Sequence, residues 1–184
     1  IFAARHERHL GVVQYRITPQ FSGDVQFSVP LGSAFKLKAV SGPKDDPLAP
    51  VWMYGQTSRP GFAPFAAVAA VGLSKNIKRP VITRPQLQLW NAAKKQYEET
   101  DVSHRSGFGH SRVDWRLRFK ARKRKTYVIT KYVAVMADPG GEIGQELDVT
   151  DEPAAAMLHN AKTLAAEAVS QGYDKVRQAH AAAM

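Results

Sequence analysis

The chain has 184 residues, of which 44% are hydrophobic and 23% charged, so it is long enough for one domain and too apolar for wholesale disorder. Lysine and arginine number 26 against 16 aspartates and glutamates, and the net charge of +10 suits nucleic acid, anionic membranes or phosphorylated small molecules as partners. There is no cysteine, which excludes disulfides, thiolate catalysis and cysteine-ligated zinc or iron–sulfur centres.

The start of the chain and its apolar runs bear on where the protein is found. The sequence does not begin with methionine, and its start has no signal-peptide pattern. The longest apolar run, residues 62–73, is well short of the roughly 20 residues that a membrane span needs. We therefore expect a soluble piece of a longer protein without a membrane partner, with the cytoplasm favoured and a periplasmic or secreted parent left open.

Two runs near the start predict β-strands. Residues 9–18 are rich in strand-forming side chains and end at Pro19. Residues 25–29 alternate strictly between apolar and polar positions. A short Ser-Gly-Asp turn separates the two runs, which predicts a hairpin with one buried face.

The middle of the chain is less regular. Five prolines and two glycines lie within residues 43–64 around Trp52 and Tyr54, which predicts a long ordered loop or a string of short strands. Residues 65–73 then form a strand or a short helix, two alternatives that the alanine-rich sequence leaves open. Residues 81–90 predict a further strand.

The clearest strand covers residues 112–120. Apolar side chains, including Trp115 and Phe119, alternate there with charged ones that are nearly all cationic, so one face is apolar and the other basic. A turn at 121–125 leads to a more buried strand at 127–136. This number of strands with few helices favours a mainly β fold, an antiparallel β-sandwich that we place at residues 1–138.

Residues 139–184 change character and predict a loop followed by two linker helices, an α-helical hairpin. Thr150 or Asp151 suits the N-terminal cap of the first helix, and Gly172 suits the break before the second. Apolar residues recur at three and four positions along the first helix. Two helices have little core of their own, so we expect this stripe to pack on the sandwich or on a partner. The partner-packing candidates are Met157, Leu158, Leu164 and Val169.

The excess positive charge is concentrated at residues 112–131, where nine cations stand against one acid. One interpretation is a basic strand and turn that binds nucleic acid or another polyanion. The other is a solvated sheet face that discourages edge pairing. The alternation favours the second, because Trp115 and Phe119 point away from the cations, whereas nucleic-acid modules place both kinds on one face. The polyanion-binding candidates are Arg116, Arg118, Arg122, Lys123, Arg124 and Lys125.

No constellation in the sequence predicts catalysis or metal binding. His6 and His9, and likewise His104 and His110, lack the spacing and the further ligands of a metal site. Serine, histidine and aspartate occur together at 101–110, but no nucleophile elbow accompanies them. Glycine-rich phosphate loops are missing as well. We therefore expect no catalytic residue, no metal and no cofactor in this chain.

Two stretches carry a recognisable pattern. Residues 2–19 place an aromatic residue and a turn before His-Leu and an alternating strand that ends in Thr-Pro, and a Ser-Gly turn follows. Residues 127–135 (YVITKYVAV) form a strand with Lys-Tyr-Val, and after it come a helix, Gly-Tyr-Asp at 172–174 and His180. In this order and spacing the chain resembles the N-terminal domain of glycoside hydrolase family 65, the family of maltose, trehalose and kojibiose phosphorylases and acid trehalases.

The resemblance covers both ends of the chain and departs from the family in three places. Residues 32–109 diverge, and Met184 stands where the family usually has tryptophan. The first strands of the family's sandwich have no counterpart before Ile1. The resemblance therefore implies the later part of the sandwich, truncated at its N-terminus, and the linker that leads towards an (α/α)6 catalytic barrel.

A supporting role is what the resemblance implies. The family's catalytic residues lie in the barrel, so none is carried onto this chain, which we do not expect to be catalytic alone. The parent would act on an α-glucosidic disaccharide by inverting hydrolysis or phosphorolysis, without a cofactor. The partners would be the barrel, in the same parent chain or as a separate chain, a second copy in a homodimer, and the α-glucoside through the parent. Nucleic acid is a partner only under the polyanion alternative. Trp52 and Tyr54 are candidates for carbohydrate contact from a loop at the active-site mouth, or for a hydrophobic plug beneath such a loop.

Overall fold

In the computed structural model the chain is mostly antiparallel β-sheet with two helices after the last strand. This confirms the mainly β sandwich and the helical pair that the sequence predicts. The structure describes residues 1–28, 31–33, 36–41, 51–56, 66–77, 81–82, 86–91, 93–99, 111–114, 116–138 and 152–184.

The strands form three sheets in which neighbours run antiparallel. The six-stranded sheet has the order β1 (Phe2–Ala3), β2 (Leu10–Ile17), β13 (Tyr127–Asp138), β7 (Ala66–Lys75), β6 (Val51–Gln56) and β5 (Lys36–Ser41). The four-stranded sheet has the order β10 (Gln96–Glu99), β9 (Gln86–Asn91), β11 (Ser111–Asp114) and β4 (Leu31–Ser33). The three-stranded sheet has the order β3 (Gly23–Ser28), β12 (Arg116–Ala121) and β8 (Val81–Ile82). The helices are α1 (Glu152–Gln171) and α2 (Tyr173–Ala182).

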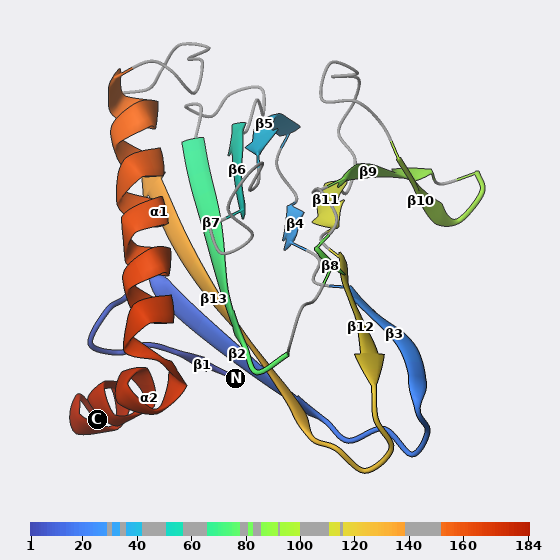
Figure 1. Cartoon of the computed structure of the whole chain (residues 1–184). Helices are drawn as coiled ribbons and strands as arrows, with labels where there is room; N and C mark the ends of the chain where they lie inside the picture. Colours follow the sequence, from blue (N-terminus) through green and yellow to red (C-terminus); the bar gives the residue numbers. More distant parts are fainter. Residues whose placement is uncertain are drawn as a thin grey trace.

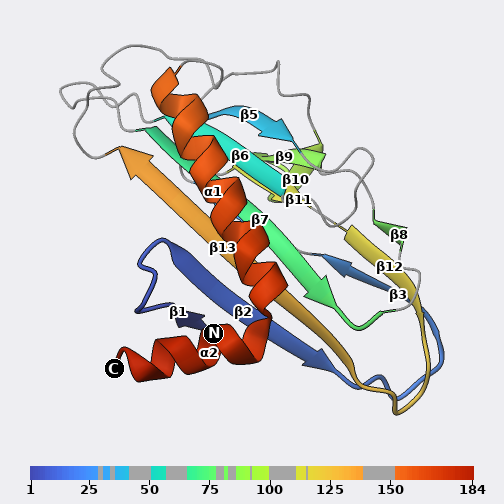
Figure 2. The same cartoon turned by 60° about the vertical axis from the view of Figure 1, so that its left-hand side comes forward.

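These elements stack in three layers. Figures 1 and 2 show α1 lying across one face of the six-stranded sheet, with the two smaller sheets on the opposite side. The central strand β7 (AAVAAVGLSK) lies between β13 and β6 and contacts α1. Of the two alternatives left open for residues 65–73, the strand is the one that forms.

Alanines bring α1 close to the sheet. Ala154, Ala161 and Ala165 are 0% exposed and form one buried cluster with Ala134 of β13. Single methyl groups on both sides let the helix approach the strands closely, and many small dispersion contacts accumulate over that area. Larger side chains pack around the margin of the cluster. They are Trp52, Met136, Met157, Leu158 and Leu164.

A second cluster ties α2 to the start of the chain. Val176 of α2 is fully buried and packs in one cluster with Leu10 of β2. The ring of Phe2 stacks on His180 with centroids 4.7 Å apart. The Arg5 main-chain N–H donates to His180 Nδ1 at 3.2 Å. Strand β1 and helix α2 therefore hold each other in place, side by side at the foot of the molecule (Figure 2).

The space between the six-stranded and three-stranded sheets contains the other part of the core. Leu117 and Phe119 of β12 are buried, whereas Arg118 and Lys120 on the opposite face of the strand are exposed. Phe119 reaches across to Tyr127 at the start of β13, with ring centroids 4.8 Å apart. Over residues 116–120 the predicted alternation is confirmed, with the apolar face inward and the basic face outward. The predicted inward position of Trp115 lies outside the described residues.

The predicted hairpin between residues 9–18 and 25–29 is wrong. Strand β2 pairs with β1 and β13, while β3 pairs with β12 in a different sheet. The two strands instead face each other across the sandwich, where Tyr15 contacts Phe27 with ring centroids 5.0 Å apart. This stacking brings apolar side chains of the two strands into contact and leaves Val25 and Phe27 half-buried and Tyr15 38% exposed. The connection crosses between the sheets at Pro19, a buried residue.

Two further predicted strands are each divided between sheets. Residues 81–90 form β8 in the three-stranded sheet and β9 in the four-stranded sheet. Residues 112–120 form β11 and β12 in the same two sheets. The divisions match because β9 pairs with β11 and β8 pairs with β12. An alternating pattern predicts that a strand forms, and it carries no signal for the point at which the chain passes from one sheet to the next.

One charged side chain faces the interior of the sandwich. Tyr132 and Ala134 of β13 pack in the clusters on the helix side, so Lys131 lies on the opposite face of the strand, where it is 9% exposed. Burial lowers the pKa of Lys131 from its ordinary value of 10.5, because the interior solvates the charged amine less well than water does.

This burial predicts a pH-dependent stability. Lys131 has a lower pKa in the folded chain than in the unfolded chain, so as the pH falls the unfolded chain takes up the proton first. The free energy of unfolding therefore falls with decreasing pH until Lys131 is also protonated in the folded chain. We expect Lys131→Met to gain free energy of unfolding at pH 7 relative to the parent, and the difference to narrow as the pH rises towards 10.5. Urea unfolding at pH 7, 9 and 10.5 measures it. Lys162→Met, on the exposed side of α1, is the control, and a difference independent of pH would contradict the prediction.

Candidate functional site

Two crossings between sheets lie side by side and form a corner of the sandwich, at the lower right of Figure 1. In the turn between β12 and β13, the Lys125 N–H donates to the Arg122 carbonyl at 3.1 Å. The Arg124 N–H of this turn donates to the Pro19 carbonyl in the connection between β2 and β3, at 2.8 Å. One main-chain hydrogen bond, from Arg124 to Pro19, thus joins the two crossings.

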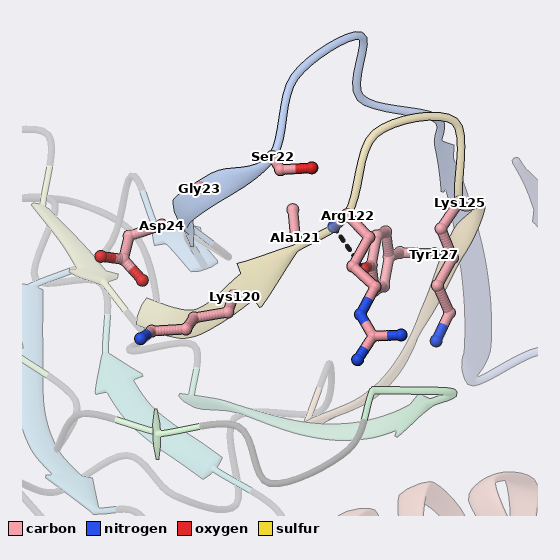
Figure 3. A pocket seen from close by; sticks show the side chains of 8 residues that line it. All are labelled: Ser22, Gly23, Asp24, Lys120, Ala121, Arg122, Lys125 and Tyr127. Carbon is pink, nitrogen blue, oxygen red and sulfur yellow. Dashed lines mark hydrogen bonds between the residues drawn. The ribbon is translucent and has the colours of Figure 1, made fainter.

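The corner is hollowed into a cavity of about 660 Å³, which we call the corner pocket. Figure 3 shows that the side chains of Arg122 and Lys125 extend in the same direction beside the ring of Tyr127, while Asp24 and Lys120 lie at the other end. The residues that line it are Ser22, Gly23, Asp24, Lys120, Ala121, Arg122, Lys125 and Tyr127.

Both hydroxyl groups of the corner pocket accept hydrogen bonds from the main chain. The Arg122 N–H donates to Tyr127 Oη at 2.9 Å, and the Lys123 N–H donates to Ser22 Oγ at 2.9 Å. A hydroxyl group has one proton to donate in addition to its acceptor lone pairs. Because the turn already supplies a donor to each oxygen, both O–H protons remain available to another partner. Each hydroxyl can therefore donate its proton to a ligand while it keeps its bond from the turn.

Three cations and one carboxylate complete the lining. The Lys125 Nζ lies 5.5 Å from the centroid of the Tyr127 ring, which is a cation–π contact. Asp24 and Lys120 are partners in the register of β3 and β12. No acidic side chain in the described part of the chain forms an ion pair with Lys120, Arg122 or Lys125. The lining therefore carries a net positive charge, and none of its cations is neutralised through an ion pair with another described residue.

Chemically, this set of groups suits the binding of an anion. General acid–base cleavage of a glycoside uses a pair of carboxyl groups, and the corner pocket contains one, Asp24. The pocket lining also contains no histidine. Among the residues that the structure describes, no group of three or more His, Asp or Glu side chains could hold a metal ion.

Four of the six predicted polyanion-binding residues belong to the turn at the corner. Arg122 and Lys125 line the pocket. Lys123 and Arg124 are exposed, and they contribute main-chain N–H groups that hold the corner together. Two of the three cations that line the pocket, Arg122 and Lys125, are therefore among the predicted residues, whereas the third, Lys120, is not. Binding of a polyanion by these residues stays a prediction.

The other two predicted residues lie on the outer face of β12, away from the aromatic side chains. Arg116 is half-buried, and Arg118 Nε donates to Gln26 Oε1 of the neighbouring strand at 2.7 Å. The buried Phe119 points to the opposite side of the strand. A base could therefore not stack on Phe119 while its phosphate met Arg118, and the nucleic-acid alternative gains no support.

Sequence interpretation missed the other half of the pocket. The sequence predicts Ser22 and Asp24 as part of an ordinary turn, and Tyr127 as the first residue of a buried strand. They meet because two connections cross between the sheets at one corner. The signal that could have found this corner is Pro19, which ends one strand and has no N–H for a hairpin ladder.

The candidates for carbohydrate contact, Trp52 and Tyr54, lie in β6. Of residues 43–64, the structure describes only β6, and its presence favours the string-of-strands alternative there. Trp52 is half-buried and packs against the alanine cluster beneath α1, so packing alone accounts for it. The side chain of Tyr54 and the whole of residues 101–110, with His104 and His110, lie outside what the structure describes. Carbohydrate contact by Trp52 and Tyr54 stays a prediction.

The partner-packing candidates of α1 contact the chain's own sheet. Met157, Leu158 and Leu164 pack against the alanine cluster, and Val169 packs in the cluster that holds α2. All four are half-buried. Of the two alternatives for the apolar stripe, packing on the sandwich is the one that the structure shows, and contact with a further partner stays a prediction.

The corner turn predicts a stabilising substitution. Arg124 has a φ of 62°, in the left-handed region where a β-carbon is strained and glycine is not. We expect Arg124→Gly to raise the free energy of unfolding by up to about 1 kcal/mol, once relief of strain is offset against the greater freedom of glycine in the unfolded chain. Lys123→Gly, one residue earlier and without a positive φ, should instead lower it by about 0.5–1 kcal/mol. Urea unfolding distinguishes them, and equal losses would contradict the prediction.

Comparison with known proteins bears directly on this fold. The whole chain, residues 1–184, matches the sequence profile of the N-terminal domain of glycosyl hydrolase family 65, which confirms the resemblance seen in the sequence. A similar solved structure is a protein from the human microbiome that is provisionally described as a kojibiose phosphorylase. The match has a TM-score of 0.57 and 12% sequence identity, over 95% of this chain and 19% of that one.

The chain therefore spans about a fifth of the length of that protein, and at this identity the likeness is one of fold. No curated protein matches the sequence. In the part of the chain that the structure describes, neither helix is both long and apolar enough to cross a membrane.

Proposed function

Because the chain belongs to glycosyl hydrolase family 65, as its N-terminal domain, we propose that it is the non-catalytic β-sandwich and linker portion of an enzyme that cleaves α-glucosidic disaccharides. The sandwich would be residues 1–138, and residues 139–184 would form the linker towards an (α/α)6 barrel. Cleavage would proceed with inversion, by hydrolysis or by phosphorolysis, and maltose, trehalose and kojibiose are the substrates to test.

The observation that carries this proposal is the profile match along the whole chain. The catalytic residues would then be supplied by the barrel, whether it follows in the parent chain or is a separate chain.

The packing of α1 supports a mechanical role for the linker. Ala161 and Ala165 seat the helix on the six-stranded sheet, and Val176 anchors the next helix to the same sheet. A helix pair held in this way would give the barrel a rigid attachment rather than a flexible tether. Contacts between two copies, which the family resemblance also implies, remain part of the proposal.

An activity assay tests the proposal. The purified 184-residue chain is incubated with kojibiose, trehalose and maltose, each with and without inorganic phosphate, and release of glucose and glucose 1-phosphate is measured. We expect no turnover by this chain. A longer protein, expressed from the same gene through the barrel that we propose, should turn over one of the three disaccharides.

Two results would contradict the proposal. One is turnover by the 184-residue chain that survives repeated purification and scales with its concentration. The other is genomic DNA around the coding segment that encodes no (α/α)6 barrel in the same gene or beside it. The first would assign catalysis to this chain, and the second would remove the partner that the linker is proposed to hold.

A further inference from the structure

We propose that the corner pocket binds a small phosphorylated polyhydroxy compound, such as a sugar phosphate. The pocket is built from two connections that hydrogen bonds fix together, so its lining does not depend on a ligand for its shape. This inference concerns the residues of this chain alone and stands whether or not the parent enzyme has the activity proposed above.

The first argument is the hydrogen-bonding character of one end of the pocket. Arg122 and Lys125 can only donate, and the hydroxyl of Tyr127 already accepts the Arg122 N–H. The Ser22 hydroxyl likewise already accepts a hydrogen bond from the Lys123 N–H. A ligand with several acceptor oxygens suits this end, and a phosphate group has three on one centre.

The second argument is charge. Arg122 and Lys125 extend in the same direction beside the Tyr127 ring (Figure 3), and no acid of the described residues forms an ion pair with either. Two cations on one short turn repel each other unless an anion lies between them. A bound phosphate would remove this repulsion and make charge-assisted hydrogen bonds, which are shorter and stronger than neutral ones.

The third argument is the other end of the pocket, where Asp24 and Lys120 lie. The carboxylate of Asp24 repels a phosphate and accepts hydrogen bonds from hydroxyl groups. Lys120, its partner across the two strands, can donate to hydroxyl or ring oxygens. A ligand that carries phosphate at one end and hydroxyl groups at the other satisfies both ends, whereas free phosphate satisfies one.

The shape of the site favours a small molecule over a polyanion. The side chains of Asp24, Lys120, Arg122 and Lys125 border a cavity of about 660 Å³ rather than forming a strip. Two basic residues outside the pocket, Arg116 and Arg118, lie on β12, whose aromatic residue Phe119 is buried on the opposite face. Two more, Lys123 and Arg124, are exposed on the corner turn. A polyanion could bind along β12 without entering the pocket. Heparin is therefore included as a probe for polyanion binding.

Titration followed by NMR tests the proposal. The 15N-labelled 184-residue chain is titrated with glucose 6-phosphate, inorganic phosphate, glucose and heparin at constant ionic strength. We expect saturable shifts with glucose 6-phosphate, confined to amides at 19–24 and 120–127. Inorganic phosphate should produce the same shifts at least threefold more weakly, and glucose alone should produce none.

Two variants test the assigned residues. Arg122→Gln combined with Lys125→Gln should weaken binding of glucose 6-phosphate at least tenfold. It keeps the main-chain hydrogen bonds of the turn, so its amide spectrum should otherwise match the parent. Asp24→Asn should weaken glucose 6-phosphate more than inorganic phosphate, because its carboxylate is assigned to the hydroxyl groups.

The matched control is Lys94→Gln combined with Lys95→Gln. It removes the same charge from the turn between β9 and β10, where Lys95 has a φ of 52°, close to that of Arg124 in the corner turn. Binding unchanged in this control and lost in the corner variant supports the proposal. Equal weakening in both would show attraction by overall charge and overturn it.

Three further results overturn the proposal. One is the absence of saturable shifts with glucose 6-phosphate. Another is equal affinity for glucose 6-phosphate and inorganic phosphate with no effect of Asp24→Asn, which overturns the assignment to a sugar phosphate. The last is a result in which heparin shifts the amides of β12 but not those of the pocket, and glucose 6-phosphate shifts neither. That result would assign the basic surface to binding of a polyanion.

Discussion

Replacing Ala165 with glutamate is expected to lower the free energy of unfolding by more than about 3 kcal/mol. Ala165 is 0% exposed and faces the buried cluster around Ala134 of β13. The close approach of α1 to the sheet leaves no water for a carboxylate there, and no described cation lines that cluster. The charge would be buried without a partner, or the helix would move away from the sheet.

The matched control is the next residue of the same helix. Ala166 is exposed, so Ala166→Glu has the same effect on intrinsic helix propensity without burying a charge, and we expect a change within about 0.5 kcal/mol. Urea unfolding followed by circular dichroism measures both variants. If Ala165→Glu does not fold, Ala165→Leu tests the same contact, with an expected loss of about 1–3 kcal/mol through overpacking. Similar stabilities at positions 165 and 166 would contradict the packing of α1 described above.

Truncating Leu117 to alanine is expected to lower the free energy of unfolding by about 3 kcal/mol. Leu117 is 1% exposed and lies on the inward face of β12. Its loss removes buried apolar surface and leaves a cavity, because β12 is held by β3 and β8 on either side and cannot collapse into the space.

The neighbouring Arg118 provides the comparison. Its side chain is exposed on the outer face and donates to Gln26, so Arg118→Ala should cost less than about 1 kcal/mol. Thermal and urea unfolding of both variants measure the contrast between the two faces of one strand. Equal losses, or a larger loss at Arg118, would show that the basic face and not the apolar face is buried.

The helical tail was predictable because its signals are local. Gly172 has a φ of 79°, a conformation that favours glycine, and it separates α1 from α2 as the sequence predicts. The apolar spacing of α1 likewise identified the buried face, with Ala161 and Ala165 at its centre. Each of these features depends on residues within one or two helical turns, so the sequence contains all the information needed.

Sheet membership was not predictable, because it depends on distant residues. The alternation at 25–29 correctly indicated a strand, and in β3 (Gly23–Ser28) one face is half-buried and the other exposed. Whether its neighbour is β2 or β12 is decided by residues about 90 positions away, such as Arg118, which is the register partner of Gln26. A period of two is the same whichever strand lies alongside, and this is why the predicted hairpin was wrong.

The corner pocket shows the same limit for a site. Arg122 and Lys125 were found as cations in a turn, since charge is visible in the sequence. Ser22 and Asp24 could not be joined to them, because their contact depends on two crossings that lie about 100 residues apart. The donor character of Tyr127 depends on one main-chain hydrogen bond, from Arg122, and a hydrogen bond of that kind has no sequence pattern.

The pairing of β2 with β13 also sets when this domain can fold during synthesis. Tyr127 pairs with Ile17, and Ala134 pairs with Leu10, so the ribosome must add more than 100 residues after β2 before its partner exists. At about 5–20 residues per second this takes on the order of 5–20 s, during which β2 has an unpaired edge. The cell therefore has to protect that strand for seconds, and slowing translation between the two strands should increase aggregation of the nascent chain rather than help it fold.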